Sequence, residues 1–186
     1  MNLEKIIQIV NYILQKYNFT LNYTKLLKIL YIADRECLRR WDFAISEDTY
    51  CAMKQGMVLS GLYSFITQEA DESSQARWNS CFKKDGDNDL CSIVKENCSY
   101  DELSKAEIEI LDEVDKKYHS KDWKFLVDEI HHNFREWKEV DEKKEKSSVK
   151  VKKETILLSL GRSEDEIKEI ISNENAYRKC KDDLQG

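Results

Sequence analysis

Residues 24–40, TKLLKILYIADRECLRR, form the most apolar segment of an otherwise polar chain. Between Leu26 and Ala33, every residue except Lys28 is apolar. On a helix such a run covers more than one face, which is typical of a helix packed on several sides. Asn22 or Thr24 can cap its start by accepting a hydrogen bond from a free N–H group of the first turn. The sequence therefore predicts a central buried helix around which the rest of the chain is arranged.

Asp34 places a carboxylate on an apolar face of this predicted helix. Its neighbours at spacings of three, four and seven are Leu27, Leu30, Tyr31, Cys37 and Leu38. An unpaired buried charge is costly, so we expect a partner, either Lys54, a histidine or the hydroxyl of Tyr50. We favour a structural acid that fixes the following loop. A functional acid is the alternative.

A second stripe of the same helix is cationic. It consists of Lys25, Lys28, Arg35 and Arg39, which recur at helical spacing with Ile32 between them. We favour a solvated face, or one matched by acids elsewhere in this acidic chain. The alternative is a contact surface for an anionic partner such as nucleic acid, as in an operator-binding repressor.

The other predicted elements follow from apolar periodicity, capping residues and turn signals. They are an amphipathic helix at 2–17, a loop with one short strand near Tyr50 over 41–57, a helix at 59–70, a hairpin pairing 78–84 with 89–95, and helices at 104–119 and 120–131. The predicted fold class is therefore α+β and predominantly helical, with a central buried helix and a small antiparallel β-hairpin.

The C-terminal third differs in composition. Residues 141–153 are rich in lysine and glutamate and predict a charged linker or loop. A helical hairpin is expected over 154–186, because Gly161 ends one short helix and Ser163 and Glu166 cap the next. We expect it to dock back on the domain rather than act as a free partner-binding arm. The predicted organisation is one domain at 1–140, the linker and this hairpin.

Composition excludes several classes of protein. The chain has 186 residues, a net charge of −6 and no apolar run of the ~18 residues that a membrane span needs, so we expect a cytoplasmic protein that binds polyanions poorly. Five scattered glycines form no phosphate loop, and six cysteines without a CxxC pair are expected to be reduced thiols. Asp128, His131 and His132 lack the spacing of a helical zinc site. We expect neither a metal nor a cofactor.

The segment from Leu26 to Ile66 resembles the Panacea domain, also called the SocA-like antitoxin domain. That family typically has a leucine-rich helix running into Leu-Tyr-x-Ala-Asp-Arg, then Tyr-x-Ala, a Gly-Pro-Val turn and a Leu-Tyr helix. The matching residues here are Leu30, Tyr31, Ala33, Asp34, Arg35, Tyr50, Ala52, Gly56, Val58, Leu62 and Tyr63. Met57 stands where the family usually has proline. A second group matches further on, at Leu103, Ser104, His132, Glu136 and Trp137, so the resemblance covers about 20 to 140.

The resemblance implies an antitoxin that neutralises a toxin encoded beside it by direct protein–protein binding. Some relatives look like adaptors that deliver a toxin to a protease, so a protease is a possible second partner. Nucleic-acid binding is the alternative from the cationic stripe. An enzyme using Asp34, His131 and His132 is a third reading, but these groups form no nucleophile–base pattern, so we expect no catalytic residues.

The expected partner contacts combine the cationic stripe with an adaptable apolar surface. They are Arg35, Arg39, Met53, Met57 and Tyr63. Ordinary core packing of the two methionines and the tyrosine is the alternative, and is favoured on burial statistics. The residues expected to support the structure are Tyr31, Asp34, Tyr50, Gly56, His132 and Trp137.

Overall fold

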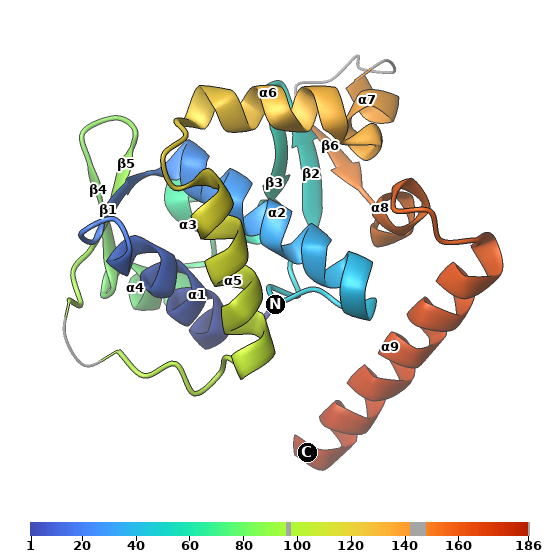
Figure 1. Cartoon of the computed structure of the whole chain (residues 1–186). Coiled ribbons are helices and arrows are strands. Elements are labelled where there is room, and N and C mark those ends of the chain that lie inside the picture. The colour runs from blue at the N-terminus through green and yellow to red at the C-terminus, as the bar shows by residue number, and fades with distance from the viewer. Residues whose placement is uncertain (96–97, 142–147, 186) are drawn as a thin grey trace.

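The computed structural model describes residues 1–95, 98–141 and 148–185. Its centre is helix α2 (Tyr23–Trp41), which other helices and two small sheets surround (Figure 1). Asn22 caps α2, because its side-chain oxygen accepts a hydrogen bond from the Lys25 N–H at 3.1 Å. The helix ends at Asp42, whose φ of 62° is left-handed. The predicted central buried helix and the predominantly helical α+β class are confirmed.

Further helices bury apolar side chains in the core that surrounds α2. They are α1 (Leu3–Gln15), α3 (Ser60–Thr67), α4 (Glu72–Asn79), α5 (Lys105–Tyr118), α6 (Trp123–Asn133) and α7 (Arg135–Asp141). The predicted capping box at the start of α5 is present, with Ser104 and Glu107 each bonding the other's backbone. Among the described residues, no helix is long and apolar enough to cross a bilayer.

The first sheet contains the predicted hairpin and one unpredicted strand. Strands β4 (Phe82–Asp85) and β5 (Asp89–Ser92) pair antiparallel around the expected turn. Strand β1 (Thr20–Asn22) pairs with the other edge of β5, giving the order β1-β5-β4. The hairpin is shorter than predicted, because Trp78 lies in α4 and packs against Phe65 and Phe82.

The second sheet brings together segments that are far apart in the chain. Strands β2 (Tyr50–Met53) and β3 (Gly56–Leu59) form a hairpin, where the sequence predicted one short strand. Strand β6 (Ser148–Val151) pairs antiparallel with the other edge of β2. Part of the expected linker at 141–153 is therefore a strand, because Val151 alternates with exposed Lys150 and buries its side chain. The rest of the expected linker, 142–147, lies outside the described residues.

The C-terminal region divides into a docked helix and a projecting helix. Ile156 and Leu157 on α8 (Lys153–Ser159) are fully buried, whereas α9 (Glu164–Gln185) runs away from the body (Figure 1). Among the α9 side chains that the structure describes, the buried or half-buried apolar ones lie in its first turns, and Tyr177 is 67% exposed. Docking is thus seen for α8 and for the base of α9. The boundary expected at residue 140 stays a prediction.

Candidate functional site

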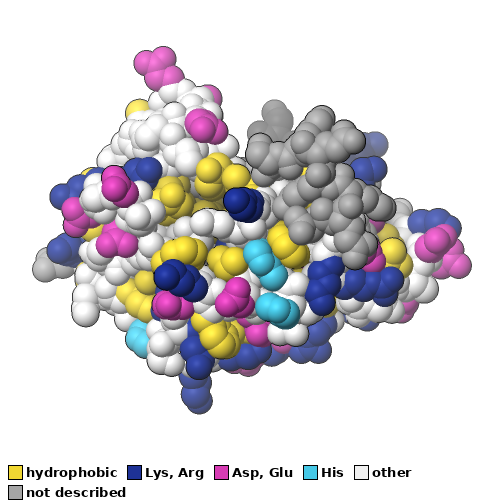
Figure 2. All heavy atoms as spheres, turned by 90° about the horizontal axis from the view of Figure 1, so that it is seen from above, with side chains coloured by type: hydrophobic (Ala, Val, Ile, Leu, Met, Phe, Trp, Pro, Cys, Tyr) yellow, Lys and Arg dark blue, Asp and Glu magenta, His cyan; other side chains and the backbone are white. Residues whose placement is uncertain are grey.

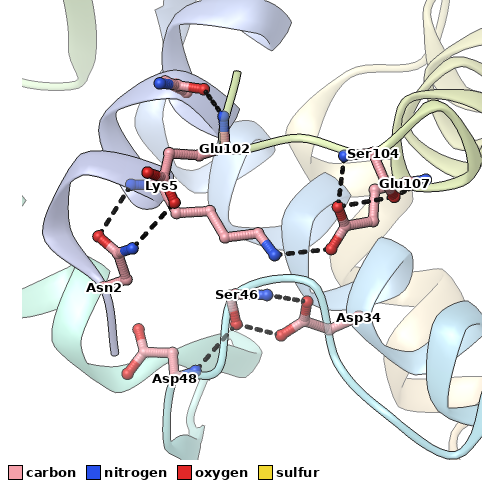
Figure 3. A network of polar contacts seen from close by, with 9 residues as sticks. Asn2, Lys5, Asp34, Ser46, Asp48, Glu102, Ser104 and Glu107 are labelled. Atoms are coloured by element: carbon pink, nitrogen blue, oxygen red, sulfur yellow. Dashed lines mark hydrogen bonds and ion pairs between the residues drawn. The ribbon is translucent and has the colours of Figure 1, made fainter. Parts of the chain in front are cut away.

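Asp34 fastens the loop at 42–49 to the central helix. Its carboxylate is 1% exposed and accepts hydrogen bonds from the Ser46 N–H at 2.9 Å and from the Ser46 hydroxyl (Figure 3). It also accepts a hydrogen bond from the Tyr50 hydroxyl at 3.3 Å. Tyr50 was one of the expected partners, and Ser46 was not. Burial raises the pKa of Asp34 to about 6, although these donors work in the opposite direction. The favoured structural reading of Asp34 fits these contacts.

Glu136 joins three helices through a second buried cluster. Its carboxylate is fully buried and accepts hydrogen bonds from the Tyr31 hydroxyl at 2.8 Å, Arg35 Nε at 2.6 Å and the Ser159 hydroxyl at 2.7 Å. Burial raises the pKa of Glu136, but the hydrogen bonds and charge of Arg35, together with the Ser159 hydroxyl, outweigh burial and hold the pKa below its ordinary value. The Arg35 guanidinium also lies 4.3 Å from the centre of the Phe134 ring. Tyr31 and Arg35 therefore anchor α7 and α8 to α2.

The predicted solvated cationic stripe is wrong for its two lysines. Lys28 is 1% exposed and donates to the Met57 carbonyl at 2.9 Å. Burial lowers the pKa of Lys28 to about 7. Lys25 is 6% exposed and donates to the His119 carbonyl at 2.7 Å. Helical spacing identified a shared face, but α5, α6 and β3 cover that face in the folded chain.

The five predicted contact residues have unequal exposure. The Arg39 side chain is 53% exposed and pairs with Glu36 on the same helix. Met53 and Tyr63 are half-buried. The Arg35 side chain is 19% exposed because it is held by Glu136, and Met57 has no exposed surface. Arg39, Met53 and Tyr63 thus keep surface for a partner, and we leave Met57 out of the proposed contact surface.

The remaining motif residues have structural contacts. Gly56 has a φ of +96°, and a Cβ there would lie 3.2 Å from Ile130 Cγ2 on α6. The Trp137 indole N–H donates to the Met53 carbonyl at 3.1 Å. The ring of His132 is on the surface, with its Nδ1 2.8 Å from the Asp128 carbonyl of its own helix. The contacts of Gly56 and Trp137 tie the β2–β3 hairpin to α6 and α7, whereas that of His132 stays within α6.

The face above α6 is chemically mixed. Figure 2 shows small hydrophobic areas there, separated by basic, acidic and histidine side chains. Among the described residues, no group of three or more histidine, cysteine, aspartate or glutamate side chains is placed to hold a metal ion. This face therefore presents a polar surface with scattered apolar contacts rather than a built site.

A hollow of about 930 Å³ lies between the 41–50 loop and α9. One wall carries Trp41 and Phe43, whose rings stack with centroids 5.7 Å apart. The other wall is formed by Ile170, Ile171 and Tyr177 of α9. The Lys5–Glu107 ion pair, at 2.7 Å, also lines the hollow and lies beside the Asp34–Ser46 contact (Figure 3). The loop that Asp34 fastens is therefore one wall of this hollow.

The hollow was not predicted, although the sequence contains a signal for it. Trp41 and Phe43 are aromatic residues in a segment without helical or strand periodicity, and Tyr177 continues the apolar side of the last helix that begins with Ile167, Ile170 and Ile171. Each is unremarkable alone, because single exposed hydrophobic residues are common on protein surfaces. Only the folded chain places them on facing walls.

The architecture is that of a helix-rich α+β domain whose motif residues serve as anchors between segments. Residues 26–138 match the family model described as "Antitoxin SocA-like, Panacea domain", and the chain belongs to this family. The match contains Tyr31, Asp34, Arg35 and Glu136 and stops before β6, α8 and α9. No curated protein and no solved structure matches the chain.

Proposed function

We propose that this protein is an antitoxin that neutralises a cognate toxin by direct protein–protein binding, without catalysis of its own. The observation that carries the proposal is the family match over residues 26–138. The burial of Lys25 and Lys28 favours a protein partner over nucleic acid, because it removes two of the four cations on which DNA binding rested. We place the complex in the cytoplasm, as expected for such a pair.

The proposed contacts include the exposed part of the predicted surface. Arg39 offers a charge at the end of α2, and Met53 and Tyr63 offer half-buried apolar surface on β2 and α3. The buried clusters around Asp34 and Glu136 hold these elements in place. Preformed surfaces of this kind lose less conformational entropy on binding than flexible ones.

The test begins with a tagged pull-down from the native host with the neighbouring gene intact, read by mass spectrometry. A small protein from that gene, recovered in stoichiometric amount, is then expressed alone and together with this chain. The proposal expects growth arrest in the first case and growth in the second. Toxicity that persists beside a stoichiometric, folded antitoxin would refute it.

Two further readouts separate the alternatives. Protease subunits in the pull-down, with toxin levels that recover when the protease is removed, would identify a delivery adaptor. A salt-sensitive gel shift of the protein on its own promoter would identify a repressor, since phosphate contacts weaken steeply with salt. Neither result is expected from neutralisation by binding alone.

A further inference from the structure

The hollow between the 41–50 loop and α9 has exposed hydrophobic residues on opposite walls. Phe43 is 48% exposed and Tyr177 is 67% exposed. Ile170 and Ile171, on the same wall as Tyr177, are half-buried. Single exposed hydrophobic residues are ordinary on protein surfaces. Because these residues line one hollow from two sides, they form an apolar groove.

The groove is preformed because polar contacts fix both of its walls. Arg162, in the turn between α8 and α9, pairs with Asp42 at 2.8 Å. Lys153 at the start of α8 pairs with Glu174 on α9 at 2.7 Å. Ser159 is bonded to the buried Glu136. The base of α9 is thus tied to the ends of α2 and α8, and its distance from Phe43 is set before a partner arrives.

Only some of the charged side chains around the groove have partners within the described part of the chain. Most of its acids already have partners in the chain: Asp42, Asp48, Glu107 and Glu174. Lys150 and Lys152 are exposed at the β6 side, and in the described part of the chain neither has an acidic group within 4 Å. Glu47 and Glu154 are the exposed acids of the lining. The β6 side therefore carries two exposed lysines that form no ion pair with described residues, whereas Glu47 and Glu154 are exposed in the same lining.

We propose that this groove receives an amphipathic helix of the cognate toxin. The apolar stripe of that helix packs between Phe43 and Tyr177, and acidic residues beside the stripe lie along Lys150 and Lys152. A groove lined on both sides by apolar side chains suits helix-in-groove recognition, in which anchors recur every three or four residues. The inference rests on the proposed function. It adds the groove, with its α9 wall, to the proposed contact surface beside Arg39, and α9 lies outside the family match.

The experiment measures binding of the purified toxin encoded beside this gene, using the full-length chain. Three variants are compared with the wild type by calorimetry: Phe43→Ala with Tyr177→Ala, Lys150→Glu with Lys152→Glu, and Phe125→Ala as the matched control. Phe125 is 40% exposed on α6 and does not line the groove. All the replaced side chains are exposed, so circular dichroism melting curves should coincide with the wild type.

The expected result is a loss of about tenfold or more for the aromatic pair, typical of aromatic anchors in interfaces. The charge reversal should also weaken binding, with a loss that shrinks as salt is added. The Phe125→Ala variant should bind like the wild type. Hydrogen exchange should slow at 41–44 and 167–177 when the toxin is present.

Failure of this inference is distinguishable from failure of the proposed function. A wild-type chain that neither binds nor neutralises the toxin overturns the proposed function and the inference together. A wild-type chain that binds, with groove variants that bind equally well, overturns the inference alone. A homodimer that dissociates when Phe43 and Tyr177 are replaced would show that a second copy occupies the groove, and would also overturn it.

Discussion

Replacing Lys28 with methionine should stabilise the protein near neutral pH and remove most of the dependence of its stability on alkaline pH. Lys28 is 1% exposed, and burial lowers its pKa from 10.5 to about 7. No described carboxylate offsets this lowering. Between these two pH values the unfolded chain keeps the proton that the folded chain has lost. Stability therefore rises with pH across this window, by about 1.4 kcal/mol per pH unit from this group.

The magnitude follows from that slope and from one lost hydrogen bond. Below pH 7 Lys28 is charged in both the folded and the unfolded chain. Burying this charge then lowers the free energy of unfolding by at most about 5 kcal/mol. Methionine keeps the length of the side chain but leaves the Met57 carbonyl unpaired, which costs about 1–3 kcal/mol. We expect Lys28→Met to be more stable than the wild type by about 2 kcal/mol at pH 6.5, and this advantage to shrink by about 3 kcal/mol and so to be lost by pH 9.5.

The assay is urea unfolding at a series of pH values between 6.5 and 9.5, followed by tryptophan fluorescence, since Trp78 is 1% exposed in the folded chain. Lys54→Met, on the exposed β2–β3 turn, is the control and should parallel the wild type. Equal slopes for the wild type and Lys28→Met between pH 7.5 and 9.5 would refute the reasoning. So would a Lys28→Met variant that is less stable than the wild type at pH 6.5.

Three further predictions concern the buried anchors. Glu136→Ala should cost about 3–5 kcal/mol in urea unfolding, because it leaves the Arg35 charge without its partner, and hydrogen exchange in α8 should rise more than in α1; equal changes in both helices would contradict the anchoring role. Gly56→Ala should lower stability by about 1–3 kcal/mol in thermal unfolding, because φ is +96° and Ile130 is close, whereas Gly86→Ala, at φ +60° on an open turn, should cost less. Asp34 has a pKa raised to about 6, so the folded chain keeps its proton longer than the unfolded chain; stability should fall by up to about 3 kcal/mol as pH rises from 4 to 6, and Asp34→Asn should flatten that part of the curve.

Much of the helical framework is predictable from local signals. The apolar run at 26–33 predicted a buried central helix, Asn22 was one of its two expected caps, and Ser104 and Glu107 marked the start of α5. Each of these signals involves residues within about two helical turns, so the chain carries them regardless of what surrounds it. The motif residues Tyr31, Asp34 and Arg35 likewise identified the family from sequence.

The candidate site was less predictable, because its side chains meet across long separations. The Asp34 carboxylate was expected to need a donor, and Tyr50 is one, but Ser46 became its principal partner only when the 42–49 loop folded over α2. Lys25 and Lys28 looked like surface cations, because helical periodicity does not reveal which neighbour covers a face. Met57 was named as a possible contact residue although ordinary core packing was favoured, and its side chain on β3 is completely buried.

The sequence by itself determined the central helix, the cap at its start, the β4–β5 turn and the family to which the chain belongs. The tertiary structure decided that β6 pairs with β2, that Glu136 joins α2, α7 and α8, and that Phe43 and Tyr177 face one another across a hollow. The reason is physical: capping and periodicity depend on neighbours along the chain, whereas strand pairing, burial of a charge and the shape of a groove depend on which distant segments the hydrophobic core brings together.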